Sequence, residues 1–522
     1  MPQLNRLRLG LGLGTLAVAT SILFFAGCAP EENRSDDGDL SLGRAALTAG
    51  STSSSYLVSF TSGGVPANAD ALVAAAGGTV AVRYLSAGAV LARSGDAGFA
   101  PRLRATAGIQ AVGAARSVHS RIALPHGAPG GAHPPGAHPP GAAGDPLSPR
   151  QWDMDQIHAP AAHAVTLGRR SVLVGVLDSG IDATHPDLVG QVDAAASVSC
   201  VGGIPDPTRS VWSNDVLGHG THVAGIIAAA KNGVGIVGVA PGVRLAAVKV
   251  VIDDLTDPNA GLVFADAVVC GLDWAAAHGF DVMNASLVVD PSEGPDDNIF
   301  CGDDPDRAAV IAIIRAAVQQ AARKNATLVA ATGNLFLNLA SLTDASGARC
   351  RVLPVQAPRA IGVSAVGPTR QLAWYSDYGF GAVDLTGPGG NALIPAPPAT
   401  ADPLVQVLSS MPSSSLFYQG AASYGGQVQD CSVTPCATYA YIQGTSMAAP
   451  HVTGVAALAI SRFGSLPPEI LLGILSLTAR PLACPPSPYD PGATGMPATC
   501  VGPARFNNFY GAGEVDALAV VR

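Results

Sequence analysis

The sequence is poor in charge. Only 13% of its 522 residues are charged, whereas 48% are hydrophobic. This balance excludes intrinsic disorder over the whole chain and is typical of a globular protein with a large core, long enough for two or three domains. The formal net charge is −9 and the few lysines and arginines are scattered, so the chain lacks a basic stripe. Nucleic acid is therefore not expected as a partner.

The chain also lacks the C-x-x-C spacing that is typical of zinc sites. Apart from Cys28, eight cysteines remain, and an even number in an exported chain predicts up to four disulfides. The eight are Cys200, Cys270, Cys301, Cys350, Cys431, Cys436, Cys484 and Cys500. Short loops favour pairing of Cys431 with Cys436 and of Cys484 with Cys500, although many other pairings stay open.

The N-terminus resembles an export signal. Two arginines precede an uncharged run over residues 9–27, which ends in LFFAGC at Cys28. The small residues before this cysteine resemble the cleavage box of bacterial lipoproteins, in which the cysteine becomes lipidated. We therefore expect a signal segment over residues 1–28 and a lipid at Cys28, with an uncleaved membrane anchor or an ordinary signal peptide as alternatives. Each alternative exports the rest of the chain, as a bacterial cell-envelope lipoprotein or a secreted protein.

Three segments follow the signal. Residues 29–51 are polar and acidic without apolar periodicity, which predicts a solvated tether. Residues 52–120 show strand, helix, strand, strand, helix and strand patterns in turn, and this order predicts a small α+β domain of ferredoxin-like topology. Residues 121–149 contain GAHPP twice and cannot build a core, so we expect an exposed linker open to proteolysis. Its three histidines fit a solvated spacer better than a metal site.

From residue 150 to residue 522, short apolar runs alternate with helical patterns. The apolar runs are SVLVGVLD, RLAAVKVV, FDVMNASL, ATLVAATG and AIGVSAVG. The helical patterns are HGTHVAGIIAAAKN, LVFADAVVCGLDWAAAHG and RAAVIAIIRAAVQQAARKN. Such alternation predicts an α/β domain built on a doubly wound parallel sheet. Sites in such sheets form at the carboxyl ends of the strands.

Three side chains suited to nucleophilic catalysis occupy informative positions. Asp178 ends the run VLVGVLD, His219 opens a helical pattern, and Ser446 opens another in GTSMAAPHVTG. A serine needs a base within hydrogen-bond reach, and that base needs a carboxylate to fix its tautomer and stabilise its cation. His219 and His222 also have a spacing that allows both to face one zinc ion.

Five motifs in one order resemble those of the subtilisin-like serine proteases, the subtilases. The motifs are VLDSGIDATHPDL, GHGTHVAG, ATGN, GTSMAAPHVTG and the terminal YGAGEVDALAVV, all within residues 150–522. The order Asp, His, Ser is that of subtilisin. The resemblance implies hydrolysis of peptide bonds in proteins or peptides through an acyl-enzyme, with no cofactor required for the chemistry.

The resemblance also implies a role for each matching residue. Asp178 orients the imidazole, His219 is the base, and Ser446 is the nucleophile. Ser446 lies where a helix N-terminus favours an anion, and Asn334 is the second oxyanion donor. His222 becomes a packed neighbour, because zinc would compete for the nitrogen that must accept the serine proton. The alternatives are an ordinary loop asparagine at position 334 and a turn or capping aspartate at position 178.

Substrate contacts follow from the same resemblance. It implies that six residues contact the substrate, either in the strand that pairs with the substrate backbone or in the wall of the primary specificity pocket. They are Ser286, Leu287, Val288, Ala331, Thr332 and Gly333. A glycine is usual in the family where Val288 stands, so its side chain should narrow the pocket entrance. No acidic residue is visible there, which favours apolar over basic side chains at the cleaved position.

A structural calcium ion is a further implication of the resemblance. Asp187 and Asn232 match two side-chain ligands of a calcium site found in many subtilases, and oxygen ligands suit that ion. The glutamine that usually completes the site is not found at the matching position. A turn aspartate and a loop asparagine therefore remain an equal alternative.

The domain at residues 52–120 resembles, by pattern alone, the inhibitor-like propeptide of subtilases. Such a domain assists folding and occupies the cleft until it is cut away, and the pattern QWDMDQIHAP predicts a cut just before Gln151. A lipid on Cys28 would then stay with the propeptide. We therefore expect an exported serine endopeptidase made as a zymogen.

Three other functions are weighed against this expectation. The first is a catalytically inactive, lipid-anchored binding protein on a subtilase scaffold, which would have no need to keep all four catalytic residue types. The second is a zinc hydrolase, whose activity would depend on a metal and not on Ser446. The third is an esterase, whose G-x-S-x-G elbow is replaced here by GTSMA.

Overall fold

The computed structural model describes ten stretches of the chain. They are residues 54–115, 119–123, 145–253, 260–289, 305–343, 347, 349–392, 405–422, 425–492 and 497–522. The expected signal with Cys28, the tether, most of the linker and Cys301 lie outside the described residues. The chain divides into two compact units, residues 1–51 and 52–522, and everything described here belongs to the second.

The N-terminal domain has the six elements that the sequence predicts, in the predicted order. They are β1 (Ser54–Phe60), α2 (Ala69–Ala75), β2 (Thr79–Tyr84), β3 (Ala89–Ser94), α3 (Phe99–Arg104) and β4 (Ile109–Ala114). The four strands pair antiparallel in the order β2-β3-β1-β4. Alternate residues of each strand face opposite sides of the sheet.

Both faces of this small sheet are buried. One face, with Val58, Val90 and Val112, packs on α2 and α3 and forms the domain's own core with Phe99. The other face contributes residues such as Leu57, Tyr84 and Leu91 to the main core of the chain. The domain is therefore packed on one side by itself and on the other by the larger domain.

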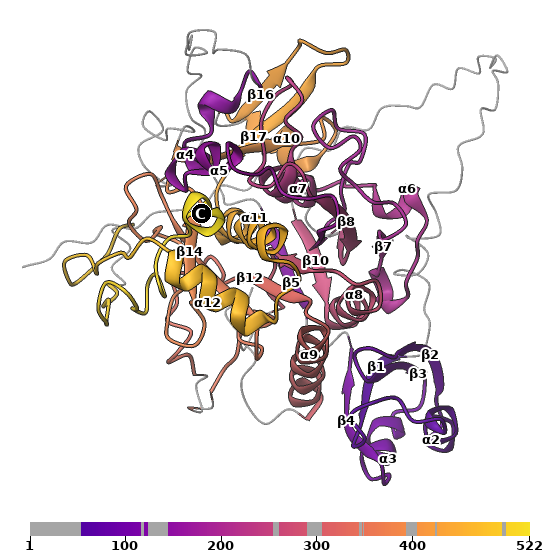
Figure 1. Cartoon of the computed structure of the whole chain (residues 1–522). Coiled ribbons are helices and arrows are strands. Elements are labelled where there is room, and N and C mark those ends of the chain that lie inside the picture. The colour runs from indigo at the N-terminus through magenta and orange to yellow at the C-terminus, as the bar shows by residue number, and fades with distance from the viewer. Residues whose placement is uncertain are drawn as a thin grey trace, which may run out of the picture. The chain divides into compact units, whose positions relative to one another are not determined.

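The larger domain is built on a seven-stranded sheet, in the order β14-β13-β12-β11-β6-β8-β7, and its strand pairs run parallel. Figure 1 labels β14, β12, β8 and β7 of this sheet. The strands are β6 (Leu173–Asp178), β7 (Val198–Ser199), β8 (Arg244–Lys249), β11 (Val282–Ala285), β12 (Thr327–Ala331), β13 (Ile361–Val366) and β14 (Leu385–Pro388). Every residue of β6, β12 and β13 is buried, as expected of parallel strands covered on both faces. The predicted α/β class is confirmed.

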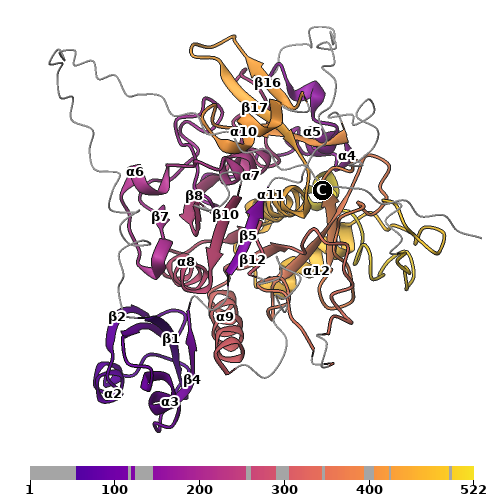
Figure 2. The ribbon, with the colours of Figure 1, turned by 180° about the vertical axis from the view of Figure 1, so that it is seen from behind.

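Helices surround this sheet in two packed groups. The long ones are α7 (His219–Ala228), α8 (Ala265–Ala277), α9 (Pro305–Arg323), α11 (Thr445–Phe463) and α12 (Pro468–Thr478). The shorter ones are η1 (Ser148–Arg150), α4 (Trp152–Gln156), α5 (Ala159–His163), η2 (Val201–Gly203), α6 (Arg209–Trp212), α10 (Leu416–Ala421) and α13 (Ala517–Val521). α7 packs against α11, and α8 packs against α9. Both figures draw α8 and α9 beside each other (Figures 1 and 2).

Two three-stranded sheets flank the large one. The first has the order β5-β10-β9, with β5 (His119–Ala123), β9 (Val251–Asp253) and β10 (Ala260–Phe264). The second has the order β15-β17-β16, with β15 (Val407–Ser410), β16 (Gln427–Asp430) and β17 (Ala437–Ile442). The predicted helix over 262–279 is wrong at its start, because residues 260–264 form strand β10. Pairing of β10 with β5 and β9 outweighs the helical pattern of its sequence.

Three disulfides join described cysteines. The two predicted bridges, Cys431–Cys436 and Cys484–Cys500, are present, and Cys200–Cys270 joins the end of β7 to α8. Cys350 is disulfide-bonded as well. Within the described stretches, no single helix has the length and hydropathy to cross a membrane, although α11 and α12 together, bent by 108°, meet those two criteria.

Candidate active site

Asp178 and His219 come from adjacent parts of the large domain and meet through a short hydrogen bond. Asp178 is the last residue of β6, and α7 begins at His219 after Gly218, whose φ of +87° lies in the left-handed region. The Nδ1 atom of His219 lies 2.7 Å from Oδ1 of Asp178. Both side chains are buried, at 3% and 0% exposure. This bond fixes the orientation of the ring and leaves Nε2 to accept a proton.

The surroundings of His219 set its basicity. Burial alone lowers the pKa of His219, but the charge of Asp178, the hydrogen bond to it and the charge of Asp215 together raise the pKa above its usual value. Because an imidazole near neutral pH exchanges protons readily, this environment suits a general base whose cation must be stabilised.

Ser446 is the second residue of α11, at the exposed end of the site. Its side chain is half-buried, and its Oγ donates a hydrogen bond to the carbonyl oxygen of Ser286 at 3.2 Å. In return, Oγ of Ser286 donates to the carbonyl oxygen of Ser446 at 2.7 Å. The backbone N–H groups in the first turn of an α-helix have no intrahelical partner, so the N–H of Ser446 is available to an incoming anion.

Asn334 lies directly beside this helix end. Its Oδ1 accepts hydrogen bonds from the backbone N–H of Thr445 at 2.9 Å and from the Thr445 hydroxyl at 3.0 Å. A Cβ atom on Gly444 would lie 3.5 Å from Nδ2 of Asn334 and 3.6 Å from the backbone nitrogen of Ser446. Two N–H donors thus flank the same glycine, and Asn334 is exposed to solvent. Two converging donors of this kind are what a developing oxyanion requires.

Asp215 is a buried carboxylate that the sequence analysis did not select. Its Oδ1 accepts hydrogen bonds from the Ser179 hydroxyl and the Gly218 N–H, and its Oδ2 accepts two from Thr221, all between 2.6 and 2.9 Å. Burial raises the pKa of Asp215, and the hydrogen bonds from Thr221 and Ser179 oppose that rise. The carboxylate therefore ties the start of α7 to the end of β6, where His219 and Asp178 lie.

Asp377 supports the turn that carries Asn334. Its Oδ1 accepts hydrogen bonds from the N–H groups of Leu335 at 3.0 Å and Leu337 at 2.7 Å. Gly333 has φ +119°, and a Cβ atom there would lie 2.2 Å from Oδ2 of Asp377, so only glycine fits without a shift. No local sequence signal selects Asp377, because it contacts residues about 40 positions earlier.

The six residues expected to contact substrate lie around these groups. Ser286 and Leu287 follow β11 and are buried, whereas Val288 is partly buried. Ala331 ends β12, and Thr332 is fully buried with its hydroxyl bonded to the carbonyl oxygen of Asp377 at 3.0 Å. Gly333 donates its N–H to the Thr445 hydroxyl at 3.1 Å, next to Ser446.

His222 lies one turn after His219 and is fully buried. Its Nε2 lies 3.0 Å from the carbonyl oxygen of Ala440. Burial lowers the pKa of His222 to about 3, so the ring is neutral at physiological pH. No group of three or more His, Cys, Asp or Glu side chains in the described stretches is placed to hold a metal ion.

Asp187 and Asn232 lie on neighbouring loops. Oδ2 of Asp187 accepts hydrogen bonds from Tyr439 Oη at 2.9 Å and from the Ile236 N–H at 3.2 Å, whereas its buried Oδ1 has no hydrogen-bond partner among the described residues. Nδ2 of Asn232 donates to the carbonyl oxygen of Pro186 at 3.2 Å. Burial raises the pKa of Asp187 to about 7. A cation at Oδ1 would relieve this cost.

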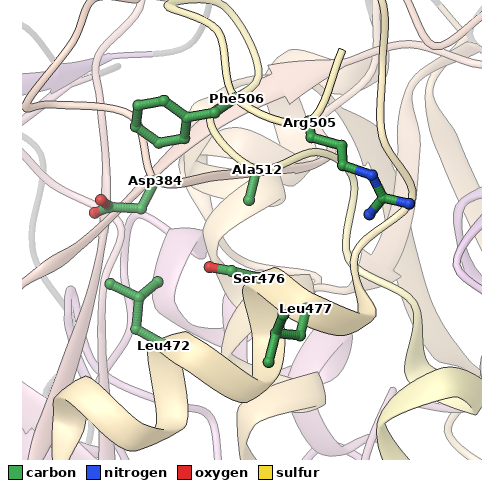
Figure 3. Close-up of a pocket in the computed structure, with 7 residues that line it drawn as sticks. All are labelled: Asp384, Leu472, Ser476, Leu477, Arg505, Phe506 and Ala512. Atoms are coloured by element: carbon green, nitrogen blue, oxygen red, sulfur yellow. The ribbon is translucent and has the colours of Figure 1, made fainter. Parts of the chain in front are cut away.

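A cavity of about 320 Å³ lies elsewhere in the large domain. Figure 3 shows Leu472, Ser476 and Leu477 on α12 on one side of this cavity, and Phe506 and Arg505 on the other. Asp384 and Ala512 complete its lining. None of these residues belongs to the groups around Ser446, and we assign the cavity no role.

The chain is similar to a known protein family over most of its length. The family model described as the subtilase family matches residues 169–513. Subtilisin Savinase of Lederbergia lenta is 32% identical over 371 residues, which cover 71% of this chain and 98% of that protein. Fervidolysin of Fervidobacterium pennivorans is 31% identical over 339 residues, which cover 64% of this chain. The chain spans only 41% of the length of fervidolysin.

Solved structures agree at the level of the fold. The crystal structure of fervidolysin has a TM-score of 0.58 and 25% identity, over 90% of this chain and 61% of that one. The epidermin leader peptide processing serine protease of Staphylococcus aureus has a TM-score of 0.62 over 90% of this chain and 98% of its own. The identity there is 18%, so that similarity supports the fold alone.

Proposed function

The chain belongs to the subtilase family, and from this premise we propose that it is an exported serine endopeptidase made as a zymogen. The observation that carries the proposal is the 2.7 Å bond between His219 and Asp178, with Ser446 and Asn334 side by side at the start of α11. The chemistry that this arrangement supports is acyl transfer through a serine nucleophile.

The proposed reaction uses the chain's own residues. His219 takes the proton of the Ser446 hydroxyl as Oγ attacks the substrate carbonyl, and Asp178 stabilises the resulting imidazolium. The N–H of Ser446 and Nδ2 of Asn334 bind the oxyanion, and His219 then protonates the leaving amine. Water next attacks the acyl-enzyme with His219 again as the base, which regenerates the free serine and releases an acid.

The zymogen part of the proposal rests on how the N-terminal domain packs. Tyr84 is 1% exposed, and its hydroxyl donates to the carbonyl oxygen of Gly203 at 2.5 Å. Arg104 forms an ion pair with Asp306 at the start of α9. Strand β5, which follows this domain, pairs with β10 of the large domain. These contacts support a propeptide that covers the larger domain and inhibits it from within the chain.

Calcium and the lipid anchor remain part of the proposal. The donor set at Asp187 suits a structural calcium ion, because a buried carboxylate oxygen lacks a partner and Asn232 lies in the neighbouring loop. This ion would stabilise the fold and take no part in catalysis. The N-terminal sequence supports export with a lipid at Cys28, which would anchor the precursor.

A panel of unblocked peptides tests the proposed function. We expect the folded, oxidised protein to hydrolyse peptide bonds, Ser446→Ala to lose this activity, and Ser446→Cys to keep its fold with altered activity. Zinc chelation should leave the rate unchanged once calcium is supplied. A protein that binds peptides without cleaving them would instead support a catalytically inactive binding protein on the same scaffold.

A further inference from the structure

The turn that carries Asn334 contains an aromatic residue with an unusual backbone conformation. Phe336 lies two residues after Asn334 and has φ +58°, in the left-handed region. Glycine adopts this region freely, whereas a bulky side chain adopts it only at a cost in free energy. Such a conformation persists only where the surrounding structure fixes it, and strained residues of this kind gather at functional sites. The contacts that fix Phe336 therefore bear on the function of the turn.

A neighbouring loop holds the backbone at and directly after Phe336. The N–H of Phe336 donates to the carbonyl oxygen of Tyr375 at 2.8 Å. The next residue, Leu337, accepts a hydrogen bond from the N–H of Tyr378 at 2.9 Å and donates its own N–H to Oδ1 of Asp377 at 2.7 Å. The turn is therefore bonded to this loop through consecutive residues.

The ring of Phe336 is anchored separately, among aromatic side chains. Phe336 is 8% exposed, and its ring centroid lies 5.7 Å from that of Tyr378. The ring centroid of Tyr378 lies 4.9 Å from that of Phe509. Phe509 in turn packs against Tyr489 and Tyr510. We refer to these five side chains as the aromatic cluster, and all of them belong to one buried core.

Hydrogen bonds fix the aromatic cluster to the rest of the large domain. The hydroxyl of Tyr489 donates to the carbonyl oxygen of Leu372 at 2.6 Å. Ser364, in strand β13 of the large sheet, donates its hydroxyl to the carbonyl oxygen of Phe509 at 2.7 Å. The ring of Phe336 is thus packed against groups that are joined to the sheet, and these groups oppose a local movement of the turn.

The turn decides where the amide of Asn334 points. The side chain of Asn334 is exposed, so close packing around the amide does not hold it in place. Its Oδ1 accepts the two hydrogen bonds from Thr445, which leaves Nδ2 to face an oxyanion. Because an oxyanion donor acts only within hydrogen-bond distance, a backbone shift of about 1 Å is enough to remove much of its effect.

We propose that Phe336 is a positioning residue for the oxyanion donor Asn334, an inference that rests on the proposed peptidase function. The aromatic cluster holds the ring, the ring holds the backbone at positive φ, and the backbone places Nδ2 of Asn334 beside the N–H of Ser446. Phe336 acts through Asn334 and does not itself bind the substrate. It therefore affects the rate of the chemical step more than the affinity for substrate.

Steady-state kinetics of Phe336→Ala and Phe336→Gly test this proposal in the folded, oxidised protein. Both variants lose the ring. Alanine adopts positive φ only at a cost, so the turn should relax and kcat should fall by roughly 20-fold, with KM within about twofold of wild type. Glycine adopts positive φ freely, so kcat of Phe336→Gly should stay about five times higher than that of Phe336→Ala. Equal kcat values in the two variants would overturn the proposal, because they would show that the ring only fills the core.

A double substitution isolates the route through Asn334. In Asn334→Leu the donor is already absent, so the further change Phe336→Ala should lower kcat by less than about twofold. An equal loss of kcat in the wild-type and Asn334→Leu backgrounds would show that Phe336 acts on another group, and the proposal would be wrong.

Phe506→Ala is the matched control. It removes a half-exposed ring, stacked on Phe380 at 5.8 Å, from the same C-terminal part of the chain. We expect its kcat to stay within about twofold of wild type. Circular dichroism and melting temperatures check that each variant folds. If Phe336→Ala does not fold, Phe336→Leu retains most of the apolar volume, and its loss of kcat should likewise disappear in the Asn334→Leu background.

These measurements separate failure of the inference from failure of the proposed function. A wild type that hydrolyses the peptide panel, with an unchanged kcat in Phe336→Ala, would overturn the role of Phe336 and leave the peptidase proposal intact. A folded wild type that does not hydrolyse the panel would overturn the proposed function and this inference with it.

Discussion

The two domains differ in what they bury. Among the described residues of the N-terminal domain, the buried polar side chains are two serines, Ser59 and Ser94. The described residues of the large domain include nine buried carboxylates. They are Asp145, Asp153, Asp178, Asp187, Asp215, Asp266, Asp377, Asp430 and Glu514. A buried carboxylate costs free energy unless it is paired or hydrogen-bonded, so the large domain carries features that packing alone does not require.

This difference explains why the sequence of the large domain contains recognisable motifs, whereas that of the N-terminal domain shows only an apolar pattern. The proposed acyl-transfer chemistry requires particular residue types at particular positions, and the sequence shows these as motifs around Asp178, His219 and Ser446. The N-terminal domain needs only apolar side chains at alternating positions, which many sequences satisfy. Substitutions in the large domain should therefore change chemistry and pH response, whereas those in the N-terminal domain should change binding.

The largest expected effect is a pH-dependent change in the free energy of unfolding caused by Asp187. Its pKa is about 3.8 in the unfolded chain and about 7 in the folded one, so the folded state keeps a proton that the unfolded state loses between these values. Without calcium, stability should therefore fall by about 4 kcal/mol as pH rises from 4 to above 7. Thermal melts in chelator would measure this, and Asp187→Asn should remove the pH dependence.

Calcium provides the control for that measurement. Added calcium should restore the stability of wild type at pH 8 and have little effect on Asp187→Asn, because the carboxylate is the proposed ligand. Equal melting temperatures of wild type with and without calcium at pH 8 would count against a calcium site.

The next effect is expected at Asn334. Asn334→Leu removes one oxyanion donor and should lower kcat by roughly 100- to 1,000-fold, or about 3 kcal/mol, with little change in KM. Asn334→Leu also removes the two hydrogen bonds that Oδ1 accepts from Thr445, so the melting temperature should fall modestly, and the kinetics are compared well below both melting temperatures. Steady-state kinetics with one peptide substrate would measure the change. A loss confined to KM would show that Asn334 binds substrate and does not stabilise the transition state.

Substitutions of Tyr84 test whether the N-terminal domain inhibits the large one. Tyr84→Ala removes a fully buried ring from the contact between the domains and should weaken inhibition by the processed N-terminal domain by roughly 30-fold. Tyr84→Phe loses only the hydrogen bond to Gly203 and should weaken it by less than about 10-fold. Dilution of the processed enzyme lets the N-terminal domain dissociate, so the rise in peptidase activity on dilution measures the inhibition in both variants. A change in kcat of fully dissociated enzyme would contradict the division between the domains.

The smallest effect is expected at Asp215. His219 must be neutral to accept the serine proton, so activity should rise with pH through its raised pKa. Asp215→Asn removes one of the charges that raise that pKa and should move the acidic limb of kcat/KM to lower pH. A pH profile from 5 to 9 measures the shift, with Asp182→Asn as the control, because Asp182 is a partly buried turn aspartate whose carboxylate bonds Thr184 and is not among the charges that raise the pKa of His219. If the acidic limb of the Asp215→Asn profile moved to higher pH, this electrostatic explanation would be wrong.

Much of this organisation was predictable from local patterns. Hydrophobic periodicity predicts the six elements of the N-terminal domain and the five strands β6, β8, β11, β12 and β13 of the large sheet. The residues around Ser446 follow from motifs that lie at strand ends and helix starts. Asp215 lies within four residues of His219, but its role depends on contacts with Ser179 and Thr221 that form only in the fold.

Two features could not be predicted because distant segments create them. Strand β10 has a helical pattern and becomes a strand through pairing with β5, about 140 residues earlier. Asp377 supports the turn after Asn334 from 42 residues further along the chain. Tertiary pairing outweighs local propensity at both places.

Covalent labelling by a serine-directed organophosphonate tests the central claim most directly, because such a reagent reacts with a serine only when a base activates it. Peptide mapping of the folded, processed protein should find one adduct, on Ser446, and His219→Ala should abolish it. Absence of an adduct on Ser446, or equal labelling in His219→Ala, would contradict the claim that His219 activates this serine.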